Sequence, residues 1–583
     1  MKKPDEACLK LSAYVTAHSV DKDFGSPRSR NSAIKRLKLM GITKVYIEAY
    51  RGGFLLEEEA LAEVRDHLLD SGFEVSGGIA TTHGEGFTEK SSGGPYWVCY
   101  SSPVSLENLE RASRVSARVF DEVIIDDFLC TACKCSRCRD AKGNREWGEL
   151  YQDLLYDFTT RRLILPAREE NPEVRLIIKY PQWYDRFHKF GYDVVRQTEA
   201  FDAVWVGTEI RDPRIDFVYQ YQPFVNYSYL RSVGGAKVQG AWFDFLWCYP
   251  EIYLEQAYQS ILAGARELVL FSYGPQKYDR KNPNASALID RTPMLERICS
   301  TIGNRGNVGI EAYKPPGSDP GYESYVFDYL GVNGFPLILT THRPSGPSVF
   351  LPGHSLQDPD VIELIKEPGN TRAILASGGL LEGLADVCGI TDLFGLSSIP
   401  VSRKTVYTYR FLVEGKEQLA EEGVLFRSHL NTKGARVISA IRGGRDYPTV
   451  TVNVVDGVSY IAASLDTFRY RAYHGDSAVT VAEPVSLIHL PQPYLDSLRN
   501  LLLSPLGVGF KSPPMVGLYM YSDGDSGISI AAIENFGDRQ ADIELTGMMF
   551  PRPFLDVDFE GTENSISMKI PGRELTLVTS SKR

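Results

Sequence analysis

The chain has 583 residues, of which 43% are hydrophobic, 23% charged and 11% aromatic, as in an ordinary globular protein. This composition excludes disordered, fibrous and coiled-coil proteins, and the length suggests about three or four domains. The formal net charge is −11 and no long basic run is present, so we expect no nucleic-acid partner. No apolar run approaches the ~20 residues that span a bilayer, and no hydrophobic leader follows Lys2 and Lys3. We therefore expect a cytoplasmic protein without a membrane partner, unless a signal peptide has been trimmed.

The first half of the chain alternates short apolar runs with stretches of helical periodicity. The strand-like runs are 11–20, 44–50, 73–80, 122–128, 174–180, 203–208, 237–243 and 267–273, and the clearest helical stretches are 57–71, 105–118, 148–168 and 251–264. Eight such units are typical of a (β/α)₈ (TIM) barrel. A doubly wound open sheet is the competing fold, but no glycine-rich phosphate loop follows the first strand. In such barrels the chemistry lies where the strands end.

The sequence changes character after about residue 300. Strand-like segments at 309–314, 335–340, 347–351 and 371–377 alternate with helix-like 356–367 and 378–388, which predicts a small α/β domain. From residue 404 onward the sequence is β-rich, and its last part is typical of a β-sandwich. We predict a catalytic barrel over 1–295, an α/β and β-rich middle domain over 296–512, and a C-terminal β-sandwich over 513–583.

The cysteines cluster unevenly. The scattered ones are Cys8, Cys248, Cys299 and Cys388, whereas the run 130–138 contains Cys130, Cys133, Cys135 and Cys138, with Cys99 some thirty residues upstream. This is not the pattern of a disulfide framework. In a reducing compartment it favours a Zn²⁺ ion held by four thiolates, a closed structural site without a position for water. The fourth ligand is either Cys130 or Cys99.

Carboxylates close three of the predicted barrel strands. Asp126 and Asp127 end the fourth strand, Glu209 follows the sixth, and Asp244 ends the seventh. Burying such groups as scaffold costs several kcal/mol each unless they have partners. Acids at several strand ends of one barrel are what cleavage of a glycosidic bond requires, with one group as general acid and another as nucleophile.

Other residues near the strand ends are candidates for substrate contact. Tryptophan faces are suited to stacking on sugar rings, and basic or phenolic side chains can bind hydroxyl groups. His83 is a weaker candidate of the same kind. The candidate substrate-binding residues are Glu48, Arg51, Lys179, Tyr180, Trp183, Trp205 and Trp242.

A family resemblance emerges from the segment Tyr96-Trp-Val-Cys99-Tyr-Ser-Ser-Pro103 followed by Cys133-x-Cys135-x-x-Cys138. It resembles glycoside hydrolase family 42, the β-galactosidase-type enzymes. The resemblance implies a structural Zn²⁺ bound by Cys99, Cys133, Cys135 and Cys138, with Cys130 outside the site. It also implies a barrel followed by a trimerisation-like domain and a small β-sandwich, hence a homotrimer acting on short oligosaccharides or glycosides.

The sequence departs from that family at the catalytic positions. The family ends strand four with Asn-Glu and takes its nucleophile from a Glu closing strand seven. Here Asp127 takes the acid/base position, Asp126 replaces the asparagine, and Asp244 is the nearest residue to the nucleophile. Shorter side chains on an unchanged backbone would widen the gap between the carboxylates, so Glu209 is an alternative partner for Asp127.

We predict an exo-acting glycoside hydrolase with paired carboxylates, retaining and β-galactosidase-like. One alternative is a substrate-assisted hydrolase of the N-acetylhexosaminidase type. In that mechanism Asp126 orients the acetamido group and Asp127 is the acid, and Trp205-Val-Gly207 faintly resembles a motif of those enzymes. Another alternative is a catalytically inactive barrel that binds a saccharide. We also expect a raised pKa for Asp127, because Asp126 stands beside it and Phe128, Trp205 and Trp242 would exclude water.

Overall fold

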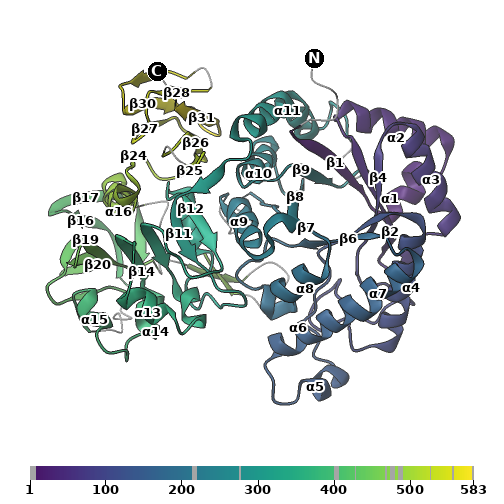
Figure 1. The fold of residues 1–583 in the computed structure, drawn as a ribbon, viewed down its shortest axis with the longest axis horizontal. Coiled ribbons are helices and arrows are strands. Elements are labelled where there is room, and N and C mark those ends of the chain that lie inside the picture. Colours follow the sequence, from purple (N-terminus) through teal and green to yellow (C-terminus); the bar gives the residue numbers. More distant parts are fainter. Residues whose placement is uncertain are drawn as a thin grey trace. The chain divides into compact units, whose positions relative to one another are not determined.

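A computed structural model describes residues 8–212, 220–274, 278–398, 406–426, 428–465, 469–472, 480–483, 490–524, 527–554 and 557–580 (Figure 1). The chain separates into two compact units. The first consists of Met1–Asp212 and Leu230–Thr301, and the second of Pro213–Tyr229 and Ile302–Arg583. No described helix combines the length and the apolar character that a bilayer-spanning segment needs.

The first unit contains a closed barrel of eight parallel strands, which confirms the predicted fold class. β1 pairs in parallel with both β2 and β9, so the sheet closes on itself. The short β3 (Phe54–Leu55) adds an antiparallel arm to β2. The barrel strands are β1 (Lys10–Val15), β2 (Lys44–Arg51), β4 (Glu74–Ile79), β5 (Glu122–Ile125), β6 (Arg175–Tyr180), β7 (Ala203–Gly207), β8 (Val238–Asp244) and β9 (Glu267–Phe271).

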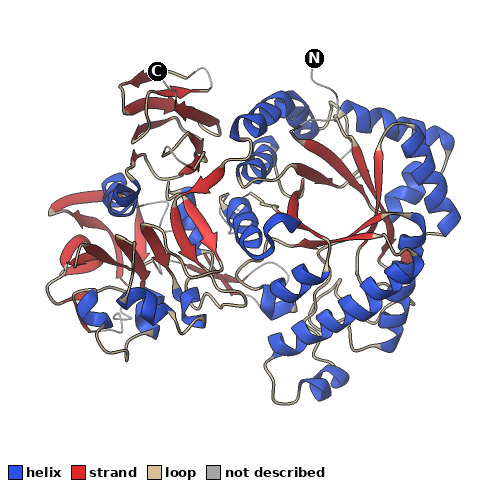
Figure 2. Ribbon diagram, in the orientation of Figure 1, coloured by secondary structure: helices blue, strands red, loops and turns tan. Residues whose placement is uncertain are grey.

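Helices surround these strands (Figure 2). The four helical stretches expected from periodicity are all present, and a π-helical turn (Thr159–Ile164) joins α6 to α7. Short 3₁₀ turns lie at Phe187–Phe190 and Gly235–Lys237. The helices are α1 (Ala17–Phe24), α2 (Pro27–Leu39), α3 (Glu58–Asp70), α4 (Pro103–Val119), α5 (Ser136–Lys142), α6 (Trp147–Phe158), α7 (Leu165–Glu170), α8 (Val194–Ala200), α9 (Gln222–Gly234), α10 (Pro250–Leu262) and α11 (Pro283–Ile302).

The first strand is shorter than predicted. Periodicity extends it over 11–20, but β1 ends at Val15 and Ala17 begins α1. The reason is local, because the Thr16 side chain accepts a hydrogen bond from the Ser19 backbone and caps the helix. The apolar residues from Ala17 onward therefore bury one face of a helix instead of continuing the sheet.

A disulfide joins two cysteines that the sequence analysis treats as scattered, which is a correction. Cys8, just before β1, is bonded to Cys299 in α11, with their Cα atoms 6.1 Å apart. The two residues are 291 positions apart in the sequence. Spacing could not indicate this pair, because only the return of α11 beside the start of β1 brings the sulfurs together.

The second unit contains a nine-stranded mixed sheet in the order β12-β11-β13-β14-β21-β20-β19-β16-β17. The four strands predicted for the α/β domain are present as its parallel half. The strands are β11 (Ile310–Tyr313), β12 (Leu337–Thr340), β13 (Ser348–Leu351), β14 (Ala373–Ser377), β16 (Val406–Val413), β17 (Lys416–Phe426), β19 (Arg436–Arg442), β20 (Asp446–Val455) and β21 (Val458–Ala463).

Short elements complete this part of the second unit. β15 (Leu396–Ser398) pairs with β18 (Asn431–Thr432), and β22 (Arg469–Ala472) pairs with β23 (Thr480–Glu483). Two 3₁₀ turns lie at Gly353–Gln357 and Ser504–Leu506. The helices are α12 (Val326–Val332), α13 (Val361–Lys366), α14 (Gly378–Gly383), α15 (Ile390–Leu393) and α16 (Gln492–Leu503).

The C-terminal strands form two antiparallel sheets, one of which also includes β10 from the middle of the chain. Their orders are β10-β25-β26-β31-β28 and β24-β27-β30-β29. Two of these strands, β10 and β24, precede residue 513, where the sequence analysis places the start of the last domain. The strands are β10 (Gly306–Val308), β24 (Gly509–Lys511), β25 (Val516–Ser522), β26 (Ile530–Asn535), β27 (Ala541–Thr546), β28 (Pro551–Pro553), β29 (Phe559–Gly561), β30 (Ser565–Ile570) and β31 (Leu575–Ser580).

Candidate active site

Lys179 joins two of the predicted catalytic carboxylates. Its ammonium nitrogen donates a hydrogen bond of 2.6 Å to Glu209 Oε1 and a second, short one to Asp127 Oδ2. The lysine lies on β6, Asp127 follows β5 and Glu209 follows β7, and these three strands are neighbours in the sheet. Because parallel strands end at the same edge, the three side chains meet at the carboxyl end of the barrel. One buried ammonium thus serves two carboxylates.

The adjacent aspartates have different environments. Asp126 is 2% exposed, and both of its oxygens have partners: Oδ1 accepts the backbone N–H of Asp127 at 2.8 Å, and Oδ2 accepts from the Arg51 guanidinium at 2.6 Å. The Asp127 side chain is 20% exposed and is held by Lys179. Asp126 is therefore a buried carboxylate paired with Arg51, whereas Asp127 is a carboxylate that solvent can reach.

Glu48 is the buried anchor of that arginine. It accepts hydrogen bonds of 2.7 Å from the Tyr14 hydroxyl and from the Ala17 backbone N–H, and it also accepts from Arg51 Nε. Glu48 is fully buried, whereas the Arg51 side chain is 17% exposed. Of these two candidates for substrate contact, only Arg51 reaches the surface of the site.

Asp244 is held by a residue that the sequence analysis did not select. Arg211 donates to Asp244 Oδ2 at 2.8 Å, and the backbone N–H of Leu246 donates to Oδ1 at 2.8 Å. Arg211 stands two residues after Glu209, and this nearness to a strand end is its only signal in the sequence.

Gln256 is a second residue that sequence reasoning missed. Its side-chain oxygen accepts the backbone N–H groups of Ile210 and Asp244 at 3.3 and 3.4 Å, and its nitrogen donates to the Asp244 carbonyl at 2.9 Å. Gln256 is fully buried in α10. It therefore ties together the backbone ends that carry Glu209 and Asp244. A glutamine within a helical stretch gives no sequence signal for such a role.

Two predicted substrate contacts lie elsewhere. Tyr180 is fully buried, and its hydroxyl lies 3.0 Å from Thr198 Oγ1 on α8. Successive side chains of a strand alternate between its faces, so Tyr180 points out of the barrel because Lys179 points in. This prediction is wrong.

Trp205 lies inside the barrel toward the end opposite the carboxylates. Its ring is 5.8 Å from the Lys44 ammonium and 5.6 Å from the Arg175 guanidinium, and these two residues begin β2 and β6. Gly240 leaves room for the indole, since a Cβ there would lie 2.1 Å from Nε1. The prediction that Trp205 binds substrate is therefore wrong as well.

The other two candidate tryptophans, Trp242 and Trp183, have different surroundings. Trp242 is 2% exposed, and its ring is 5.1 Å from the Lys179 ammonium, so it forms an apolar floor under the site. Trp183 is half-buried, with its ring 6.1 Å from Trp97 and 5.7 Å from Phe190. The Nδ1 atom of His83, a further candidate, lies 3.4 Å from Thr88 Oγ1.

Burial dominates the electrostatics of the carboxylates. It raises the pKa of Asp127 to about 7, with Asp126 and Glu209 adding to the shift and Lys179 opposing it. Burial also raises the pKa of Glu209 and of Asp244, although Lys179 and Arg211 oppose the shift. Burial alone would lower the pKa of Lys179, but Asp127 and Glu209 raise it well above the ordinary value. The expected direction for Asp127 is confirmed, with burial rather than Asp126 as the first cause.

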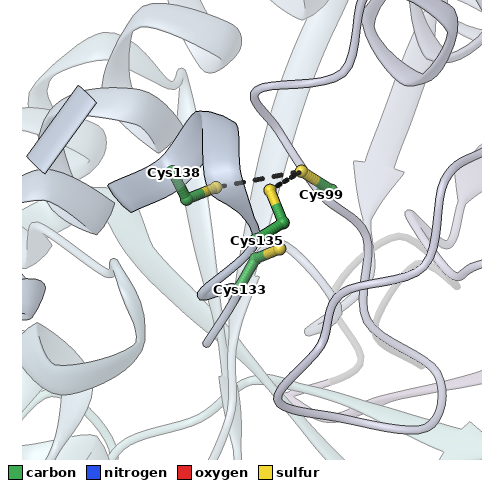
Figure 3. A group of neighbouring side chains, drawn as sticks. All are labelled: Cys99, Cys133, Cys135 and Cys138. Atoms are coloured by element: carbon green, nitrogen blue, oxygen red, sulfur yellow. Dashed lines mark hydrogen bonds between the residues drawn. The ribbon is translucent and has the colours of Figure 1, made fainter. Parts of the chain in front are cut away.

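Four cysteines form a group fit to hold a metal ion. The Sγ atoms of Cys99, Cys133, Cys135 and Cys138 all lie within 4.8 Å of one another (Figure 3). Two of the separations, from Cys99 to Cys135 and to Cys138, are 3.8 Å. A tetrahedral ion with bonds of about 2.3 Å to sulfur requires sulfurs about 3.8 Å apart. The group therefore fits a tetrahedral thiolate site, and Cys99 is its fourth member.

Cys130 lies outside this group. Its Sγ is 3.8 Å from the Asp127 carbonyl oxygen. The group instead joins the loop after β4 to the loop that continues from Asp127. Two further hydrogen bonds connect the same loops, from Thr131 Oγ1 to the Val98 carbonyl at 2.9 Å and from the Lys134 N–H to Ser92 Oγ at 2.7 Å. A metal here would fix the loop that follows Asp126 and Asp127.

Comparison with known proteins agrees with this arrangement. Residues 1–288 match the family model described as "Probable glycosyl hydrolase, catalytic domain". The barrel is a glycosyl hydrolase catalytic domain. A protein of Saccharolobus solfataricus, described as uncharacterized, is 24% identical over 415 residues, which cover 66% of this chain and 68% of that protein.

Solved structures of glycoside hydrolases share the fold along nearly the whole chain. The family-42 β-galactosidase Gan42B of G. stearothermophilus is 12% identical with a TM-score of 0.63, over 99% of each chain. α-L-Fucosidase isoenzyme 2 of Paenibacillus thiaminolyticus is 11% identical with a TM-score of 0.66, over 99% of this chain and 100% of that one. The cold-adapted β-galactosidase of Rahnella sp. R3 is 12% identical with a TM-score of 0.62, over 99% and 98%. At these identities the likeness concerns the fold.

Proposed function

We propose that this glycoside hydrolase is exo-acting and retaining, with Asp127 as the acid/base and Glu209 as the nucleophile. The observation that carries the proposal is the shared hydrogen-bond donor, Lys179. Two hydrogen bonds from one nitrogen hold the bound oxygens at most about 6 Å apart. Retaining glycosidases hold their carboxyl groups about 5–5.5 Å apart, and inverting enzymes hold theirs about 6.5–9.5 Å apart.

Protonation supports the same division of roles. With Lys179 charged, Asp127 and Glu209 are neutralised when they share one proton between them, and burial opposes further ionisation. Asp127, the more exposed, is the carboxyl that can present this proton to a glycosidic oxygen. Its pKa of about 7 lets it both donate and accept a proton near neutral pH.

The reaction then follows two displacements. Asp127 protonates the glycosidic oxygen while Glu209 attacks the anomeric carbon, which releases the aglycone and forms a glycosyl ester on Glu209. Asp127 next takes a proton from water, whose oxygen attacks the same carbon and breaks the ester. The free sugar leaves, and both carboxyl groups return to their starting state.

Asp244 is the nucleophile that the family resemblance suggests, but its contacts support a different role. Both of its oxygens accept hydrogen bonds, one from Arg211 and one from the Leu246 N–H. A nucleophile needs a free oxygen facing the anomeric carbon. The contacts of Asp126 likewise give no support to a substrate-assisted mechanism, because both of its oxygens are engaged.

The substrate that we propose to test first is a β-galactoside, since two of the fold relatives are named β-galactosidases. An α-L-fucoside is second, because a relative with the same coverage is named for that activity. A panel of nitrophenyl glycosides separates these sugars. Hydrolysis of none of them, together with binding of a sugar, would identify an inactive saccharide-binding barrel.

The decisive variants are Asp127→Asn and Glu209→Gln. The first is expected to lower kcat at least about 10²-fold on a disaccharide, with a much smaller loss on aryl glycosides whose leaving groups barely need protonation. The second is expected to abolish turnover on both substrates, with azide restoring release from the aryl glycoside as a glycosyl azide. Asp244→Asn is the matched control and should retain a measurable rate. Full activity of Asp127→Asn on the disaccharide would refute the assignment.

We further propose that the four-cysteine group holds one structural Zn²⁺ and that the enzyme is a homotrimer. Four thiolates are the usual ligand set of structural zinc and leave no position for a reacting water. Elemental analysis of unchelated protein should find one zinc per chain, and Cys135→Ser should lose it. Light scattering should give three times the chain mass of 65.1 kDa. A metal-free chain or a monomer at micromolar concentration would refute the respective proposal.

A further inference from the structure

The loop after Asp244 presents a large aromatic side chain to solvent. Trp247 is 64% exposed and its neighbour Leu246 is 43% exposed. Trp247 also has a backbone φ of 51°, in the left-handed region that bulky residues avoid. Such strain persists only where the surrounding structure imposes it, and it concentrates at functional sites.

Hydrogen bonds hold this loop against the end of β7. The Trp247 carbonyl accepts the Asp212 backbone N–H at 3.1 Å, and the Cys248 thiol donates to the Ile210 carbonyl at 3.1 Å. On its other side, the Leu246 N–H donates to Asp244 at 2.8 Å. The exposed indole therefore belongs to a loop fixed at the carboxyl ends of β7 and β8, the strands that position Glu209 and Asp244.

Trp247 differs from the other tryptophans of the chain. Trp97, Trp147 and Trp183 are half-buried against other rings, and Trp205 and Trp242 are 2% exposed inside the barrel. Within the described ranges, Trp247 alone among the six has neither a ring partner nor a cation over its face. The face that this loop exposes is thus free for a ligand.

We infer that Trp247 is the stacking platform for the second sugar of a saccharide substrate, on the leaving-group side of the scissile bond. This inference rests on the proposed function. The C–H face of a pyranose is apolar, and burying it on an indole removes apolar surface of both partners from water. The carboxylates that act on the first sugar lie at the strand ends, whereas Trp247 lies three residues beyond Asp244 on the loop that leaves the barrel. That is where the next sugar of the chain would lie.

The test compares two substrates of the sugar that the wild-type enzyme hydrolyses. One is a disaccharide, and the other is the glycosyl fluoride, whose leaving group is a single atom. Trp247→Ala should lower kcat/KM on the disaccharide about 10–100-fold, mainly through KM, and should leave the fluoride within about threefold. Trp247→Phe should keep most of the activity on both. Tyr407→Ala, which removes an aromatic side chain that is 56% exposed on β16, is the matched control and should change neither.

Three results would overturn the inference. They are equal losses on the two substrates, no loss on either, and conversion of the oligomer to monomers by Trp247→Ala, which would assign the indole to a subunit contact. None of these concerns the catalytic assignment, which fails separately if Asp127→Asn keeps full activity on the disaccharide.

Discussion

The two ends of the barrel both bury charged side chains, but they treat them differently. At the end where the strands begin, Lys44 Nζ lies 2.6 Å from Glu122 Oε1 and 3.6 Å from Glu267 Oε2. Glu267 also accepts hydroxyl hydrogen bonds of 2.7 Å from Ser12 and Tyr46. Burial alone would raise the pKa of Glu122, but the lysine, Arg175 and a serine hydroxyl together lower it.

At the end where the strands finish, carboxylates outnumber cations. Among the ion pairs of the described residues, three cations hold the carboxylates of this cluster: Arg51, Lys179 and Arg211. The carboxylates are Glu48, Asp126, Asp127, Glu209 and Asp244. Burial raises the pKa of Glu48, Asp127, Glu209 and Asp244. Paired charges at one end of the barrel thus contribute to stability. At the other end, carboxyl groups in excess over cations keep a proton available for chemistry.

The largest expected effect is that of Lys179→Met. Without the ammonium, Asp127 and Glu209 lose their common donor, and both become harder to ionise. We expect kcat to fall on the order of 10³-fold, as for loss of a positioned electrostatic group. The pH profile should also move to higher pH, since the opposing effect of Lys179 on both pKa values is gone. An unchanged profile would show that the lysine does not control the carboxylates.

The matched change at the other end is Lys44→Met. This change likewise removes an ammonium group, and it leaves the buried carboxylates of Glu122 and Glu267 with less positive charge beside them. We expect a loss of about 3 kcal/mol in the free energy of unfolding, with kcat unchanged in the folded protein. Urea denaturation and steady-state kinetics on one preparation measure both. A fall in kcat comparable to that of Lys179→Met would break the distinction between the two ends.

The disulfide provides a third, smaller effect on stability. Cys8→Ser removes a link that closes a loop of 291 residues at the start of β1. We expect the free energy of unfolding to fall by about 2–4 kcal/mol under oxidising conditions, and to be unchanged relative to wild type in the presence of a reductant. The carboxylates lie at the opposite end of the strand, so kcat should not change. Equal stability of variant and wild type under oxidation would show that the link does not form.

The smallest expected effect is the pH dependence that Asp127 gives to the free energy of unfolding. Its folded pKa is about 7, whereas an aspartate in an unfolded chain has a pKa of about 3.9. Between these values the folded state binds the proton and the unfolded state does not. The free energy of unfolding therefore falls as the pH rises, by up to about 1.4 kcal/mol per pH unit from this group. Urea denaturation at pH 5, 6 and 7 should show this slope, and Asp127→Asn should reduce it.

Glu122 is the control at the other end, because its shift has the opposite sign. Its folded pKa is lowered, so its contribution to stability is present above about pH 4.3, the unfolded value, and is lost as the pH falls through the folded value. Glu122→Gln should therefore flatten the acid side of the stability curve and leave the slope between pH 5 and 7 unchanged. A change in that slope would contradict the assignment of the two pKa shifts.

Local sequence pattern was sufficient for the architecture. The eight apolar runs predicted from the sequence correspond to the eight barrel strands, because side-chain alternation and burial act over a few residues at a time. The position of Asp127 and Glu209 at strand ends followed from the same pattern. The cysteine spacing indicated a metal site, and Cys99 emerged as its fourth member through the family resemblance.

Tertiary structure alone decided which of these residues act together. In the sequence Lys179 is one of several candidates for substrate contact. Only the pairing of neighbouring strands places its ammonium between Asp127 and Glu209. Asp126 and Asp127 are adjacent in sequence, yet only the position of Arg51 on another strand separates their roles. Tyr180 does not reach the site as predicted, because Lys179 beside it on β6 points into the barrel and Tyr180 therefore points outward. Two carboxylates can share a proton only when they lie within a few ångströms of each other. Residue spacing along the sequence carries no information about such distances between residues far apart in the chain.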